Sequence, residues 1–171
     1  MNMDQDVLDT VARFSKQGPV DVRAIISALG IEYDEKTLPS GASGQITYQD
    51  GSFQIVVNAA DVEARKRFTA AHELAHFMLH RDLLEKRGKL NRHTDILFGD
   101  NAQNNPPAPF SPSHEVQANR YAAELLMPAA RVRASWNKAE DNVEQLAKKL
   151  GVSLKAMKVR LKNLGLRDTV D

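Results

Sequence analysis

Residues 68–82, FTAAHELAHFMLHRD, contain the pentad His72-Glu73-x-x-His76. Residues four apart on an α-helix share one face and lie about 6 Å apart along its axis, so both imidazoles can reach one metal ion. Glu73 lies about 100° around the helix from His72, where it can act as a general base without being a ligand. The pentad therefore predicts a helix over residues 61–80 that carries two ligands of a metal site.

Apolar residues surround these histidines on the helix. Phe68 and Leu79 fall on the histidine face, and Leu74 and Phe77 lie on the opposite side. The helix is therefore expected to be buried all round, with Phe68 and Leu79 as an apolar wall beside the metal. His80 extends the row of histidines but lies about 12 Å along the axis from the first of them, which is too far to share one ion. It is expected to support the site or to end the helix.

The composition limits which ligands are available. The chain of 171 residues has no cysteine, so disulfides and thiolate metal sites are excluded and any metal must be held by His and carboxylate groups. A formal net charge of +1 gives no overall attraction to nucleic acid or membrane surfaces. The acidic N-terminus has no secretory signal pattern and no apolar run is long enough for a membrane span, so a cytoplasmic protein is expected.

A catalytic zinc site has three protein ligands and one open position, so a third ligand is required. A third histidine six residues beyond the pentad is absent, because Asp82 stands there. Two acids compete on the predicted helix 112–127: Glu115 shares its face with small apolar residues such as Ala118, whereas Glu124 lies on the opposite, polar side. This geometry favours Glu115 as the ligand.

The neighbours of Glu115 offer supporting and competing roles. Asn119, one turn further on, can hydrogen-bond to a ligand imidazole and determine its tautomer. His114 points about 100° away and is a weaker candidate ligand. Glu115 has an alternative role as a favourable charge at a helix N-terminus. A set of two histidines and one glutamate suits Zn²⁺ best among the common metal ions, so zinc is the expected cofactor.

The rest of the chain predicts an α+β fold with a small antiparallel sheet packed on the central helix. Residues 31–58 are rich in β-branched and aromatic residues, and Asp50-Gly51 is a strong hairpin signal. The polar segment 81–111 is expected to be irregular, with Ser111 capping the helix that follows. Further helices are expected at residues 4–16, 22–29 and 112–127, from residue 128, and on both sides of a turn near residue 151.

RKRFTAAHELAHFMLH, followed about forty residues later by EVQANRYAAELLMP, resembles the ImmA/IrrE metallopeptidases of bacteria and their mobile elements. The stretches GQITYQDGSFQIVVN and LAKKLGVSLKAMKVRLKNLGL are also similar to this family. The similarity covers roughly residues 19–166 and implies a minimal gluzincin-like fold. It predicts a metallopeptidase domain over residues 1–128 and a helical, helix-turn-helix-like extension packed on it over residues 129–171.

Carried over by position, the resemblance implies that His72, His76 and Glu115 are the zinc ligands and that Glu73 is the general base. Gln117 is a departure, because the family often has Glu there. The implied activity is a limited cleavage of a helix-turn-helix transcription repressor, which derepresses its target genes. The alternative is a non-proteolytic DNA- or repressor-binding regulator, or a toxin–antitoxin component, in which the metal is structural.

A peptidase of this kind also needs a site for an extended substrate and a donor for the developing oxyanion. Residues 52–58, directly before the central helix, are the candidate edge strand for main-chain pairing with the substrate, and ordinary sheet structure is the alternative. The candidate oxyanion donors, left unranked, are Tyr48, Tyr121, His80 and His114.

The C-terminal helix pair, capped at Ser153 after Gly151, allows two interpretations. Residues 131–171 carry 10 Lys or Arg against 5 Asp or Glu, as a DNA-reading helix requires. The basic residues of the last helix are Lys155, Lys158, Arg160 and Lys162. The same helix has apolar residues at core spacing, which favours packing on the domain over DNA binding: Leu154, Met157, Leu161 and Leu164.

Overall fold

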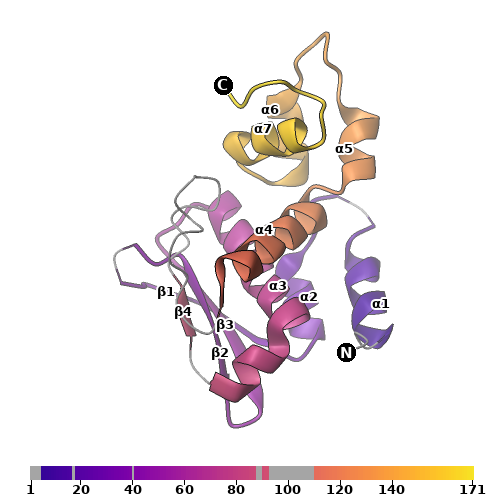
Figure 1. Ribbon diagram of the computed structural model, residues 1–171. Helices are drawn as coiled ribbons and strands as arrows, with labels where there is room; N and C mark the ends of the chain where they lie inside the picture. Colours follow the sequence, from indigo (N-terminus) through magenta and orange to yellow (C-terminus); the bar gives the residue numbers. More distant parts are fainter. Residues whose placement is uncertain (1–4, 17, 40, 88–89, 93–109) are drawn as a thin grey trace.

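The computed structural model describes residues 5–16, 18–39, 41–87, 90–92 and 110–171. These residues form an α+β fold, as predicted, in which helices pack around one four-stranded sheet (Figure 1). None of the described helices is both long enough and apolar enough to cross a bilayer. The elements are α1 (Gln5–Phe14), α2 (Val22–Ala28), β1 (Glu32–Lys36), β2 (Gly44–Gln49), β3 (Ser52–Asn58), α3 (Glu63–Arg87), β4 (Leu90–Arg92), α4 (Pro112–Leu126), α5 (Ala129–Ser135), α6 (Val143–Leu150) and α7 (Leu154–Asn163).

The strands are ordered β1-β3-β2-β4. β2 and β3 form the predicted antiparallel hairpin, and Asp50 and Gly51 have φ angles of 51° and 85°, as a type I′ turn requires. β1 pairs parallel to β3, so the sheet is mixed and the expectation of a wholly antiparallel sheet is corrected. The residue pattern of a strand in the sequence predicts that the strand forms, but it does not predict which strand of the hairpin it pairs with.

The proposed edge position of residues 52–58 is wrong. β3 lies between β1 and β2, so its backbone is paired on both sides and offers no edge to a substrate. Its residues Ile55, Val56 and Val57 are all buried, as expected for a central strand covered on both faces. Among the described strands, the edges of the sheet are β1 and β4.

The central helix is longer than predicted. It continues to Arg87, but His80 has non-helical φ and ψ angles of −131° and 23°, so the predicted end is a kink. Beyond the kink, Leu84 is fully buried, and this packing explains why residues 81–87 are helical despite their polar composition. The expectation of an irregular segment is also wrong at β4, while residues 93–109 lie outside the described residues.

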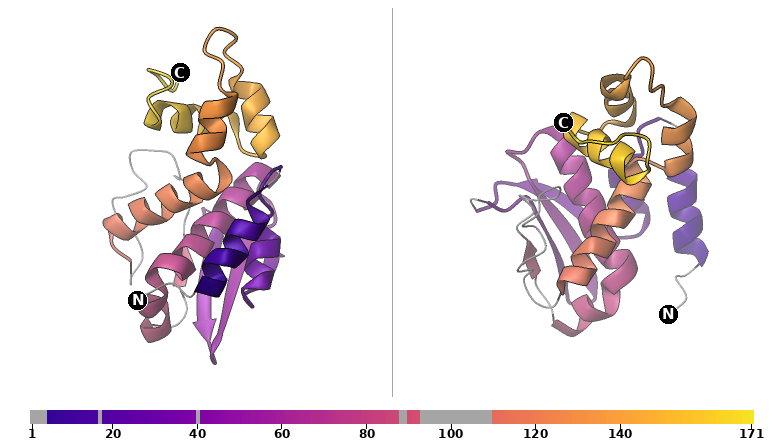
Figure 2. Two further views of the ribbon diagram at one scale, coloured as in Figure 1. Left: turned by 90° about the vertical axis from the view of Figure 1, so that its right-hand side faces the viewer. Right: turned by 45° about the horizontal axis from the view of Figure 1, so that its top comes forward.

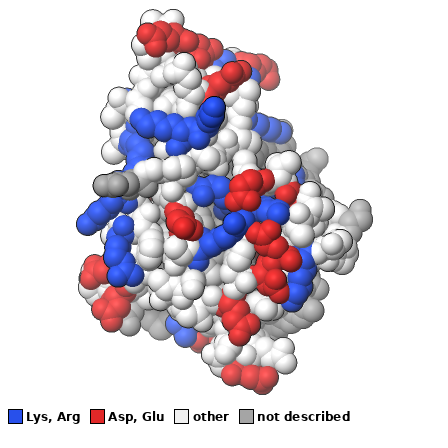
Figure 3. Space-filling view, turned by 180° about the vertical axis from the view of Figure 1, so that it is seen from behind, with Lys and Arg blue, Asp and Glu red and all other residues white. Residues whose placement is uncertain are grey.

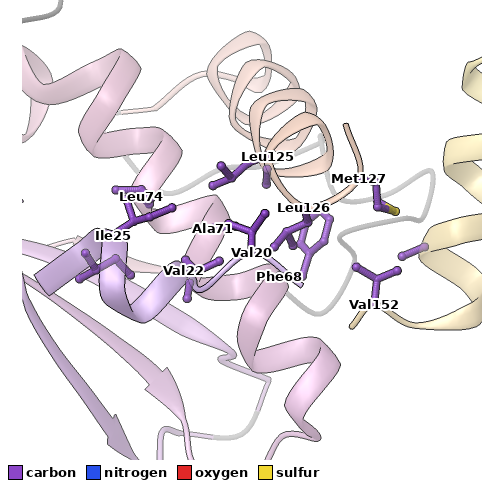
Figure 4. Packing of buried hydrophobic residues seen from close by; sticks show 14 of the residues in the cluster. Val20, Val22, Ile25, Phe68, Ala71, Leu74, Leu125, Leu126, Met127 and Val152 are labelled. Carbon is purple, nitrogen blue, oxygen red and sulfur yellow. The ribbon is translucent and has the colours of Figure 1, made fainter. Parts of the chain in front are cut away.

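Helix α3 packs on both the sheet and α4 (Figure 2), and all of residues 68–78 are buried, as the apolar residues around the helix predict. Phe68 and Leu74 of α3 contribute to a core that also includes Ile25 of α2 and Leu126 of α4 (Figure 4). Leu79 is 42% exposed, so its predicted burial is wrong.

Helices α5, α6 and α7 lie together at one end of the molecule (Figure 1). The predicted turn between α6 and α7 is confirmed: Gly151 is left-handed with φ of 65°, and the Ser153 side chain accepts a hydrogen bond from Ala156 N. Met157 and Leu161 are buried as predicted, but Leu154 is 39% exposed at the first position of α7.

Arg160 has a structural role within the fold. It is only 8% exposed, its Nε donates a hydrogen bond of 2.9 Å to the carbonyl oxygen of Met127, and its guanidinium pairs with Glu124. It thus supplies a donor at the C-terminal end of α4 and is not available to read DNA. On the face seen from behind, acidic and basic side chains are interspersed and form no single-sign stripe (Figure 3).

Replacing Arg160 with methionine is expected to lower the free energy of unfolding by about 2–3 kcal/mol. The substitution keeps most of the apolar stem but leaves the buried carbonyl of Met127 without this charged donor. Urea denaturation measures the loss. Lys162→Met, on the exposed side of the same helix, is the matched control and is expected to change stability by no more than about 0.5 kcal/mol. Equal losses in the two variants would contradict the role of Arg160.

Candidate metal centre

The three predicted ligands come from two helices that pack on each other. His72 and His76 lie one turn apart on α3, and Glu115 lies in the first turn of α4. Ser111 is the predicted N-cap of α4 and accepts from His114 N, while His114 Nδ1 accepts from Ser111 N at 3.0 Å. This reciprocal pair determines where α4 begins and so where the glutamate projects.

The donor atoms of these residues converge at one point. His72 Nε2 lies 3.2 Å from one carboxylate oxygen of Glu115, His76 Nε2 lies 3.5 Å from the other, and the two Nε2 atoms are 3.1 Å apart. All three residues are buried, and one potential ligand atom of each lies within 4.8 Å of the others. Ligands at about 2.1 Å in tetrahedral geometry are separated by about 3.4 Å, so these spacings fit a zinc ion.

The tautomer of His72 supports the same conclusion. Its Nδ1 lies 2.9 Å from Asn119 Oδ1, which can only accept, so a neutral His72 carries its ring proton on Nδ1 and directs its Nε2 lone pair inward. That lone pair faces a carboxylate oxygen of Glu115 within a buried space. Two acceptors so close repel each other unless a cation lies between them. The donor chemistry therefore fits a metal ion.

An aromatic ring packs against one of the predicted ligand histidines. The ring of Phe110 stacks on that of His76 with centroids 4.0 Å apart and an interplanar angle of 25°. Phe110 is itself only 4% exposed. Such a ring lowers the local dielectric constant and thereby strengthens electrostatic interactions at the site. Phe110 was not predicted from the sequence, because the polar segment before α4 has no pattern that places it against α3.

Glu73 is fully buried and lies on the side of α3 that faces the sheet. An ideal Cβ atom built at Gly44 of β2 would lie 3.6 Å from Glu73 Cγ and only 2.3 Å from Thr69 Cγ2. β2 can therefore pass this close to α3 only because residue 44 has no side chain. A glycine within a strand is a known sign of close backbone approach, and it could have been recognised in the sequence.

Gly44→Ala is expected to lower the free energy of unfolding by about 1–3 kcal/mol, because the new methyl group overlaps Thr69 Cγ2 and has to push β2 away from α3. Thermal or urea unfolding measures the loss. The double variant Gly44→Ala, Thr69→Ser removes the overlapping methyl group and is expected to recover most of it. Failure of the second substitution to restore stability would show that the contact between residues 44 and 69 is not the cause.

The four candidate oxyanion donors have different surroundings. Both ring nitrogens of His80 lie within hydrogen-bond distance of other side chains, so neither is placed to donate to a substrate. His114 uses Nδ1 in the helix cap, and the ring of Tyr48 packs on Phe53 with centroids 4.7 Å apart. Burial raises the pKa of Tyr121, which keeps its hydroxyl protonated.

Comparison with known families agrees with this geometry. Residues 27–162 match the family model described as the IrrE N-terminal-like domain (Peptidase_M78). The chain belongs to this peptidase family. The match spans the pentad, the helix that carries Glu115 and most of the C-terminal helix pair, so the resemblance predicted from the sequence is confirmed.

A solved structure described as a Mycobacterium tuberculosis transcriptional regulator has a similar fold, with a TM-score of 0.58 and 16% sequence identity. The similarity covers 94% of this chain and 47% of the other, so this member of the IrrE N-terminal-like family spans about half the length of that structure. At such low identity the likeness concerns the fold alone. A comparison with curated proteins gave no match.

Proposed function

We propose that the protein is a zinc-dependent endopeptidase that makes a limited cleavage in a helix-turn-helix transcription repressor. The observation that carries this proposal is the buried donor group of His72, His76 and Glu115 on α3 and α4. Glu73 directly follows His72 on α3, and the chain belongs to a peptidase family.

Each residue has a defined part in this chemistry. His72, His76 and Glu115 would hold a zinc ion, which when bound supplies Lewis acidity to a water molecule and to the peptide carbonyl. Glu73 takes a proton from the attacking water and later delivers it to the leaving amine. Asn119 keeps the inward nitrogen of His72 unprotonated.

The choice of substrate rests on the family resemblance rather than on a pocket in the structure. Cleavage of a repressor that acts on DNA would take place in the cytoplasm. We further propose that residues 1–128 form the peptidase part and that residues 129–171 are an extension packed on it. DNA binding by this extension is less well supported, because Arg160 of α7 is buried and bound to α4.

The proposal is tested on the helix-turn-helix repressors encoded in the same genome, beginning with any that a neighbouring gene encodes. Incubated with the zinc-loaded protein, the repressor is expected to yield two fragments from a single cut, detected by intact-mass spectrometry. Chelation of the metal is expected to slow the cleavage by at least about 100-fold, and one equivalent of zinc to restore it. Cleavage that is unchanged after complete removal of the metal would contradict the proposal.

Stable binding of the intact repressor or of DNA, with bound zinc but no cleavage, would favour the alternative of a regulator with a structural metal. No described feature favours a toxin–antitoxin role.

A further inference from the structure

The outward-facing nitrogen of His76 meets a second histidine. While Nε2 of His76 points toward the other predicted ligands, its Nδ1 lies 3.0 Å from His80 Nδ1. The other ring nitrogen of His80, Nε2, lies 2.9 Å from Gln117 Oε1. A chain of three side chains therefore runs from the metal centre to α4. His76 and His80 are buried, and Gln117 is exposed.

The direction of these hydrogen bonds follows from the two ends of the row, which are the metal-facing nitrogen of His76 and the amide oxygen of Gln117. If His76 binds a metal through Nε2, its single ring proton is on Nδ1, which donates to His80 Nδ1. His80 then carries its own proton on Nε2 and donates it to the amide oxygen of Gln117. Each contact thus has one donor and one acceptor, and no ring has to carry a second proton.

The kink in α3 is centred on the middle member of this chain. His80 has φ and ψ angles of −131° and 23°, outside the helical region, and its ring lies 4.6 Å from that of His114, centroid to centroid. His80 therefore contacts α4 residues as well as the preceding turn of α3. The arrangement parallels the other ligand imidazole, since His72 Nδ1 also lies against a side-chain acceptor, Asn119 Oδ1.

We propose that His80 is a positioning residue of the metal centre. It accepts the Nδ1 proton of His76 and so holds that imidazole with Nε2 directed at the metal, while Gln117 keeps His80 in the tautomer that can accept. This inference rests on the metal site of the proposed function. It predicts an effect on metal affinity that is separate from catalysis, because Glu73 is not one of the three hydrogen-bonded side chains.

The test compares two substitutions of His80 in the full chain. His80→Leu fills the space without an acceptor and is expected to weaken zinc binding by about 10–100-fold. His80→Asn places an amide oxygen at the position of Nδ1 and is expected to stay within about threefold of wild type. Zinc affinity is measured by competition with a fluorescent chelator, and urea unfolding of the metal-free proteins shows whether each variant is folded.

The two variants separate positioning from simple packing. Equal weakening by His80→Leu and His80→Asn, or wild-type affinity in His80→Leu, would overturn the proposal while leaving the zinc site in place. Failure of the wild type to bind one zinc ion would overturn both the inference and the proposed function.

A second measurement does not depend on whether the variants fold. Nitrogen-15 NMR of the zinc-loaded wild type is expected to show His76 protonated on Nδ1 and His80 protonated on Nε2. A proton on Nδ1 of His80 would overturn the inference, because that nitrogen could then not accept from His76.

Discussion

Glu73→Gln is expected to slow peptide cleavage by about 10²–10⁴-fold while the protein still binds one zinc ion. Glutamine has nearly the same shape as glutamate but cannot accept a proton from the attacking water at neutral pH. Glu73 is fully buried beside α3's two histidines and is not one of the three converging donors, so its replacement should leave the ligand set intact.

The measurement pairs cleavage with metal content. Initial rates of repressor cleavage are followed by mass spectrometry, and bound zinc is counted by elemental analysis of the same sample. Glu63→Gln, in the exposed first turn of the same helix, is the matched control and is expected to stay within about twofold of wild type. Equal cleavage rates for wild type and Glu73→Gln would contradict the assignment of Glu73 as the general base. Loss of zinc from Glu73→Gln would instead show that the carboxylate holds the metal.

Removal of the third ligand is expected to have the largest effect on metal binding. Glu115→Ala takes away the only carboxylate of the converging group and leaves two imidazoles, so zinc affinity should fall by about 10³-fold or more. Wild-type protein with zinc at 1,000 times Kd gains about 4 kcal/mol of stability, which raises Tm by about 8–16 °C. Glu115→Ala at the same zinc concentration should show almost none of this gain.

Differential scanning calorimetry with and without zinc measures both effects. Glu124→Ala is the control on the same helix: it removes the partner of Arg160 and lowers stability, but its response to zinc should match that of wild type. A zinc-induced rise in Tm that persists in Glu115→Ala would show that this glutamate is not a ligand.

Local patterns in the sequence were sufficient to predict most of the elements. The hairpin at Asp50-Gly51, the cap at Ser111 and the turn at Gly151 depend on residues adjacent in the chain, and all three are confirmed. Helical azimuths also distinguished Glu115, which lies 8% exposed against α3, from the exposed Glu124. Each of these features is specified by geometry within a single element.

The features that the sequence did not reveal depend on contacts between elements. The parallel pairing of β1 depends on which side of the hairpin it joins, and the exposure of Leu79 depends on what packs around that part of α3. Arg160 was counted only among the basic residues of a possible DNA-reading helix, yet its side chain packs on α4. The stacking of Phe110 on His76 joins positions 34 residues apart (110 − 76) with no pattern to connect them.

The C-terminal helices touch both helices of the metal centre. Arg67, one turn before the pentad on α3, donates through Nε to the carbonyl oxygen of Gly151 at 3.0 Å, and Arg160 binds the end of α4. A truncated protein lacking residues 129–171 would lose both of these hydrogen bonds. Such a deletion changes how α3 and α4 are held, so a loss of cleavage in it would not identify the C-terminal helices as the part that recognises the substrate. Point substitutions on the exposed side of α7 are the cleaner way to separate recognition from support.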